Sequence, residues 1–278
     1  MQRPDPGQIN LRDLPKNRDM INTQLHQEIH ANAQAVLYHF LSMPLWRSCE
    51  IFEEFRALDG HSHYRENPDN IKERFYYREG TRPDKVVLIA HADTFFDESY
   101  IARRIRHTLK TENGISSGTD SAIGADDRAG VAILWLLRNS GHSLLITDGE
   151  EQGLLGSGWL WGKHRDILER LNSHHFMVQL DRKNGHDFTC YRVGTPEFKQ
   201  FIQESTGFSE PLNAGNSDIS VLCGSIPGVN LSTGYYNPHT SEEYLVYSKW
   251  YHSLLTVARM LSADLPSFNL HHEAFRLT

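Results

Sequence analysis

The chain has 278 residues, of which 39% are hydrophobic and 23% charged, an ordinary composition for a soluble globular protein. Its formal net charge of −7, with no long basic run, argues against a nucleic-acid partner, because phosphates need clustered Lys and Arg. The opening "MQRPDPGQINLRDLPKN" lacks the apolar core of a signal peptide, and no uncharged stretch is long enough to cross a bilayer. The three cysteines, Cys49, Cys190 and Cys223, form neither a disulfide framework nor a CxxC motif. We therefore expect a cytoplasmic protein with no membrane partner.

The predicted elements alternate between helices and strands along the chain. They are helices over 21–44 and 50–58, strands over 74–80 and 85–93, a helix over 129–140, a strand over 142–148, a helix over 159–172, strands over 175–181 and 187–193, a helix over 195–207, a strand over 228–234 and a final helix over 241–262. Thr195 and Gly207 are expected to cap and stop their helix, and Thr240 with Glu243 to form a capping box for the last one. Continuous apolar strands between helices predict an α/β fold with a mostly parallel sheet. We expect a single domain over 1–278 with a helical N-terminal part over 1–80.

Acids and histidines stand where several predicted elements begin or end. They are His91 and Asp93 after "VVLIA", Asp126 in "GADDRAGVA", Glu150 and Glu151 after "SLLI", Asp181 after "FMVQL", and His239 after "VNLSTGYYNP". Ligands of open α/β sheets bind beyond the carboxyl ends of the strands. Each residue alone has an ordinary explanation, such as a helix cap or a solvated loop. Several acidic and imidazole groups converging on one rim, however, require a cation to neutralise them.

The motifs "HAD", "GADDRAG", "TDGEEQGLLGS", "LDRKN" and "GYYNPHTSEEYL", in this order, resemble those of the co-catalytic dizinc peptidases. This is the M28, M20 and M42 group of aminopeptidases, carboxypeptidases and deacylases. The resemblance covers residues 85–262 and implies a zinc-exopeptidase-like catalytic domain. Its fold would be a three-layer sandwich with a central, mostly parallel mixed sheet flanked by helices. The gaps between the motifs are too short for the inserted lid or dimerisation domain of many relatives.

The resemblance implies that five residues are metal ligands: His91, Asp126, Glu151, Asp181 and His239. Asp126 would bridge two divalent ions, with His91 and Asp181 completing one site. Glu151 and His239 would complete the other. Mixed nitrogen and oxygen ligands suit zinc, with manganese or cobalt as alternatives. The peptide bond that follows Asp126 would be cis, as is common in this group.

Two catalytic roles also follow from the resemblance. Glu150 matches the general base that takes a proton from the attacking water and passes it to the departing amine. Asp93 matches the residue that orients the His91 imidazole, and two residues apart on a strand they point to the same side. Neighbouring side chains leave an extended backbone in opposite directions, so Glu151 can bind metal while Glu150 faces the substrate.

Four further residues are candidates for substrate binding. Arg128 and Arg182 could bind a substrate carboxylate, or pair with local acids. Asp218, in "GNSDISVL", resembles a segment near the substrate cleft of the group, although a helix cap explains it equally well. Tyr236, or Tyr235 beside it, could place a hydroxyl near the oxyanion.

Three functions are compatible with these residues. The first is a metal-dependent aminopeptidase acting on short peptides. The second is a deacylase or carboxypeptidase acting on N-acyl amino acids or dipeptides. The third, a metal-binding module without turnover, has no need of an intact Glu150. The sequence does not indicate the oligomeric state.

Overall fold

A computed structural model describes residues 23–58, 60–96, 109–111, 115–117, 122–212 and 215–270. The strands of its main sheet are β1 (Ser62–Asn67), β2 (Asn70–Arg78), β3 (Val87–His91), β6 (Ser143–Thr147), β7 (Met177–Arg182), β8 (Phe188–Thr189) and β9 (Gly228–Ser232). They form a seven-stranded sheet in the order β1-β2-β6-β3-β7-β9-β8. Strands β6, β3, β7 and β9 run parallel, whereas the pairs at both edges are antiparallel. The predicted mixed, mostly parallel sheet is confirmed.

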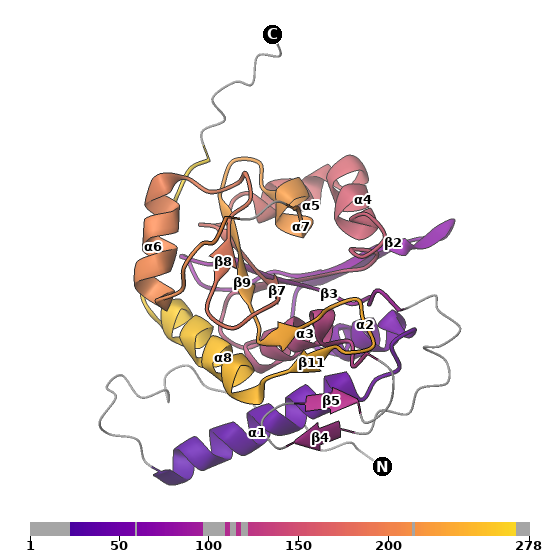
Figure 1. Cartoon of the computed structure of the whole chain (residues 1–278). Helices are drawn as coiled ribbons and strands as arrows, with labels where there is room; N and C mark the ends of the chain where they lie inside the picture. The colour runs from indigo at the N-terminus through magenta and orange to yellow at the C-terminus, as the bar shows by residue number, and fades with distance from the viewer. Residues whose placement is uncertain are drawn as a thin grey trace.

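Helices cover both faces of this sheet (Figure 1). One face packs against α1 (Thr23–Leu41), α2 (Ser48–Arg56), α3 (Ala125–Leu136), α6 (Pro196–Thr206) and α8 (Tyr247–Ser262), and the other against α4 (Leu155–Lys163), α5 (Arg165–Leu171) and α7 (Asp218–Leu222). Side chains of β3 alternate between the two cores, Leu88 and Ala90 in one, Val87 and Ile89 in the other. This is the predicted α/β sandwich. None of the described helices is long and apolar enough to cross a membrane.

A second, antiparallel sheet carries the loop that holds His239. Its strands are β4 (Leu109–Thr111), β5 (Ile115–Ser117), β10 (Tyr235–Tyr236) and β11 (Tyr244–Leu245), in the order β10-β11-β5-β4. His239 lies between β10 and β11, in the left-handed backbone region with φ of 64°. That conformation is uncommon for a residue with a side chain.

The final helix begins later than the sequence predicts. Residues 241–246 are not helical, because β11 pairs with β5 and β10 before α8 starts at Tyr247. Val246 occupies the N-cap position and no side chain caps the helix. The predicted capping box of Thr240 and Glu243 is therefore wrong.

Two other predicted elements also differ from the structure. The strand expected over 187–193 is reduced to β8, since Tyr191 has a positive φ of 48° that interrupts an extended chain. The helical N-terminal part predicted over 1–80 contains α1 and α2 but also the β1–β2 hairpin. This hairpin extends the main sheet through the antiparallel pairing of β2 with β6.

A buried ion pair ties this N-terminal part to the loop after β6. Arg74 of β2 places Nε 2.6 Å from Oδ2 of Asp148, and Ser48 of α2 donates its hydroxyl to the same oxygen at 2.9 Å. Asp148 is fully buried and lies two residues before Glu150. Helix α2 and the β1–β2 hairpin therefore help to hold the glutamate-bearing loop.

Replacing Arg74 by Met leaves the Asp148 carboxylate buried without its guanidinium. We expect the free energy of unfolding, measured by urea denaturation, to fall by about 3 kcal/mol, the lower end for a broken buried pair. The lower end applies because Lys72 Nζ remains 3.6 Å from the carboxylate. The matched variant Arg170→Met removes an exposed ion pair to Glu79 at 3.1 Å and should cost less than about 1 kcal/mol. Equal losses would contradict this assignment.

Candidate metal centre

The predicted site residues meet at one edge of the main sheet. The carboxyl ends of the parallel strands β6, β3 and β7 are neighbours, which brings the residues after them together. His91 is the last residue of β3, Asp181 lies near the end of β7, and Glu150 with Glu151 follows β6. Asp126 adds a carboxylate from the first turn of α3.

Asp126 lies between two groups of ligand-type side chains. Its Oδ1 is 3.3 Å from His91 Nε2, and its Oδ2 is 3.3 Å from His239 Nε2. His91 Nε2 is also 3.4 Å from Asp181 Oδ1. His239 Nε2 is 3.0 Å from Glu151 Oε2. The structure thus brings all five predicted ligands together, in two groups that share Asp126.

Two sets of three side chains place possible ligand atoms within 4.8 Å of one another. They are His91, Asp127 and Asp181, and His91, Asp126 and Glu151. Asp127 is the weaker ligand candidate, because its two oxygens already accept backbone N–H bonds from His91 at 3.2 Å and Gly130 at 3.0 Å. The Asp126–Asp127 peptide bond is cis, as the resemblance implied.

Asp93 connects the His91 ring to the glutamate pair. It is fully buried, and its Oδ1 lies 3.3 Å from His91 Nδ1. Its two carboxylate oxygens accept the backbone N–H groups of Glu150 and Glu151, each at 3.2 Å. With Nδ1 facing Asp93, Nε2 is the ring nitrogen that faces Asp126. Asp93 therefore positions two segments of the site at once.

Glu150 and Asp181 share a hydrogen-bonding neighbour. Ser217 Oγ lies 2.9 Å from Glu150 Oε1 and 2.9 Å from Asp181 Oδ2, and it accepts a bond from Gln179 Nε2 at 2.7 Å. Burial raises the pKa of Glu150 well above its usual value, and the charge of Asp181 adds to the rise. A carboxyl group of raised pKa beside a cluster of ligands has the properties of a general acid–base group.

The electrostatics of the cluster favour a bound cation. Burial raises the pKa of Asp181 to about 7, and burial with the nearby Asp126 charge raises the pKa of Glu151. Hydrogen bonds to Asp126 and Glu151 raise the pKa of His239 to about 10. These shifts have one origin, a crowd of buried carboxylates with little positive charge nearby. Glu151 Oε1 is buried and has no hydrogen-bond partner among the described residues, which leaves its lone pairs available to a metal ion.

The two arginines predicted to bind substrate are both buried. Arg128 is fully buried, and its Nη2 donates to the carbonyl of Pro44 at 3.3 Å. Arg182 is buried against Asp187, with Nε–Oδ1 and Nη2–Oδ2 distances of 3.2 and 3.3 Å. Arg128 Nε and Nη1 are buried without a hydrogen-bond partner among the described residues, whereas a local acid occupies the guanidinium of Arg182.

The other two substrate-binding candidates differ in position: Asp218 lies near Glu150, whose pKa its charge helps to raise, and Tyr236 faces away from the cluster. Asp218 is fully buried, and its Oδ2 accepts the Thr147 hydroxyl at 2.6 Å. Tyr236 stacks on a second tyrosine, of β11, with ring centroids 5.1 Å apart. Tyr235 is the one that reaches the site, since its hydroxyl lies 3.3 Å from Asp181 Oδ1. Successive residues of a strand point to opposite faces, so only one of the two tyrosines can face the cluster.

Glu243 is a residue of this site that the sequence analysis missed. Only 2% of it is exposed, and its Oε2 accepts the backbone N–H groups of Ile123 at 3.0 Å and Gly124 at 2.7 Å. Its Oε1 accepts the N–H of Asp126 at 3.0 Å. Glu243 therefore fixes the backbone that carries Asp126. The sequence signal, an acid shortly after His239 and before a helix, is equally typical of a capping box.

No protein-family model matches the sequence, and no curated protein matches it either. Solved structures share its fold. Aminopeptidase PepT from Bacillus cereus has 15% identity and a TM-score of 0.60, over 84% of this chain and 98% of that one. A tripeptidase from Staphylococcus aureus has 15% identity and a TM-score of 0.63, over 84% and 97%. TET1 peptidase from Pyrococcus horikoshii has 12% identity and a TM-score of 0.54, over 84% and 100%.

Replacing Glu243 by Leu removes the acceptor of three buried N–H groups. We expect the free energy of unfolding to fall by about 1–3 kcal/mol, because buried donors are left without partners. Glu242→Leu, at the exposed neighbouring position, should change it by less than about 0.5 kcal/mol in the same urea titration. If the two variants unfolded alike, Glu243 would not hold the start of α3.

Proposed function

We propose that this chain is a dinuclear-metal-dependent aminopeptidase that acts on short peptides as a single catalytic domain. The observation that carries the proposal is the position of Asp126. One of its carboxylate oxygens lies 3.3 Å from the imidazole of one acid–histidine group, and its other oxygen lies 3.3 Å from the imidazole of the second group. The fold shared with structures named aminopeptidase and tripeptidase supports the same activity.

The two groups around Asp126 would each hold one divalent ion. His91 and Asp181 complete the first set of ligands, and Glu151 and His239 complete the second. Three protein ligands per ion leave a position open for substrate or water, as a catalytic site needs. Imidazole and carboxylate donors suit zinc, with manganese or cobalt as alternatives. Two bound ions would polarise the scissile carbonyl and lower the pKa of a bound water.

The other residues would move the proton and hold the geometry. Glu150, with its raised pKa, accepts a proton from the attacking water at its carboxylate and delivers it to the departing amine. Ser217 fixes Glu150 Oε1 by a hydrogen bond of 2.9 Å. Asp93 keeps the His91 ring and the backbone of both glutamates in place.

The alternative functions gain less support. A deacylase or carboxypeptidase that recognises a substrate carboxylate through Arg128 or Arg182 would need one of these guanidinium groups to be accessible to the substrate. The first is buried in the core and the second is paired with Asp187. A metal-binding module without turnover would have no use for Glu150 beside the ligands.

Glu150→Gln tests the proposed base. After zinc loading, we expect kcat for leucine p-nitroanilide to fall by about 10²–10⁴-fold, because the amide cannot carry the proton. Zinc stoichiometry, measured by titration calorimetry, should stay that of the wild type. The exposed control Glu197→Gln should leave kcat unchanged. A normal kcat in Glu150→Gln would refute the base, and loss of zinc would make Glu150 a ligand instead.

A further inference from the structure

A cavity of about 500 Å³ lies next to the proposed catalytic base. It is lined by Tyr191, Arg192, Val193, Gly215, Asn216 and Ser220. A volume of this size is within the range of small-ligand sites. The residues that line it come from the loop after β8, from the segment that leads into α7 and, with Ser220, from α7 itself.

One wall of this cavity is continuous with the contacts of Glu150. Ser217 follows Asn216 directly, and its backbone N–H donates to Ser220 Oγ at 3.2 Å. The hydroxyl of the same Ser217 lies 2.9 Å from Glu150 Oε1 and from Asp181 Oδ2. A single residue therefore separates the cavity from the proposed proton carrier.

The opposite wall reaches Asp181 through one amide. The Tyr191 hydroxyl lies 3.3 Å from Nδ2 of Asn230. Asn230 holds the backbone of Asp181 from both sides, donating to its carbonyl and accepting from its N–H, each at 3.0 Å. One buried residue on each wall, Ser217 or Asn230, thus lies between the cavity and the Glu150 and Asp181 side of the candidate metal centre.

Every polar side chain that lines the cavity can donate a hydrogen bond, and no Asp or Glu is among them. Arg192 is exposed at its rim, and within the described ranges neither its guanidinium nor the Asn216 amide has a hydrogen-bond or ion-pair partner. The hydroxyls of Tyr191 and Ser220 can donate as well. Such a set of donors around one guanidinium suits a carboxylate, which accepts two parallel bonds from Arg.

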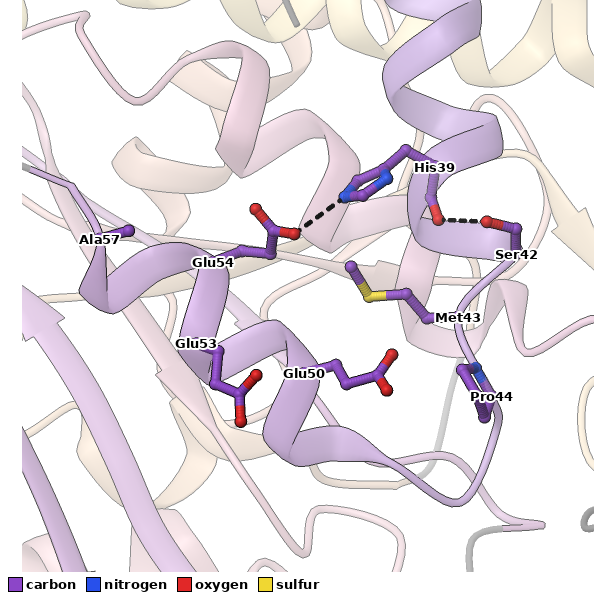
Figure 2. A pocket seen from close by; sticks show the side chains of 8 residues that line it. All are labelled: His39, Ser42, Met43, Pro44, Glu50, Glu53, Glu54 and Ala57. Atoms are coloured by element: carbon purple, nitrogen blue, oxygen red, sulfur yellow. Dashed lines mark hydrogen bonds and ion pairs between the residues drawn. The ribbon is translucent and has the colours of Figure 1, made fainter. Parts of the chain in front are cut away.

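A second cavity has the opposite character. Its volume is about 520 Å³, and it lies between α1 and α2, where Glu50, Glu53 and Glu54 surround it with His39 (Figure 2). His39 is already paired with Glu54 at 3.3 Å. The glutamate carboxylates of this cavity would repel the carboxylate of a ligand. Of these two cavities, the donor-lined one is the cavity that Ser217 and Asn230 connect to the metal centre.

We infer that the donor-lined cavity binds the C-terminal carboxylate of a short peptide, with Arg192 as its cation. The inference rests on the proposed function. Glu150 delivers a proton to the departing amine, so the leaving group lies on the side of Glu150, which Ser217 links to the cavity wall. The substrate class is therefore di- and tripeptides with a free carboxyl end.

The test compares leucyl-glycyl-glycine with its C-terminal amide on the zinc-loaded full chain. We expect the wild type to favour the free acid in kcat/KM by about tenfold or more, mainly through KM. Arg192→Gln should bring this ratio close to one, and Arg192→Lys should restore part of it. Arg259→Gln, at an exposed arginine of α8, should keep the wild-type ratio.

A binding measurement that needs no turnover accompanies the kinetics. Glycylglycine, the carboxylate-bearing product, should bind about tenfold more weakly to Arg192→Gln than to the wild type or Arg259→Gln in titration calorimetry. Equal hydrolysis of acid and amide by the wild type would overturn this inference and leave the proposed function intact. An unchanged ratio in Arg192→Gln would overturn the role of Arg192. Cleavage of neither peptide, with metal bound, would overturn the proposed function and this inference with it.

Discussion

One carboxylate held between two imidazoles organises this molecule. Asp126 comes from the start of a buried helix, His91 from the end of a central strand, and His239 from a loop of the second sheet. Their atoms are nevertheless 3.3 Å apart on both sides of the carboxylate. Burying this carboxylate with Asp181 and Glu151 is costly unless a cation compensates. This edge of the main sheet therefore carries acids whose burial does not stabilise the fold.

The support of this centre comes largely from backbone hydrogen bonds. Asp93 accepts the N–H groups of both glutamates, and Glu243 accepts three N–H groups at the start of α3. Asp148, two residues before Glu150, is anchored in turn by Arg74 from the N-terminal hairpin. Each supporting carboxylate is buried and fixes a segment rather than a single side chain. A site fixed in this manner keeps its ligands in position before a metal or substrate arrives.

The sequence was sufficient for the parts of the fold that local patterns determine. Continuous apolar runs marked β3, β6, β7 and β9, and the ends of α6 follow from local chemistry. Thr195 accepts the Phe198 N–H at 3.3 Å, and Gly207 ends the helix with φ of 72°. The predicted start of α8 was too early because the two residues of β11, which precede the helix, pair with β5, a strand far away in the sequence. The order of the motifs predicted the five ligand candidates. The positions of the other candidate residues depend on burial and on strand register. Neither the burial of Arg128 nor the choice between Tyr235 and Tyr236 can be read from a local pattern.

The most direct test of the central claim is a crystal structure of the zinc-soaked protein, with anomalous diffraction recorded at the zinc absorption edge. The account predicts two zinc ions, one on His91 and Asp181 and one on Glu151 and His239, with the Asp126 carboxylate between them. Crystals that hold no zinc at this edge of the sheet, or a single ion that Asp126 does not touch, would contradict it.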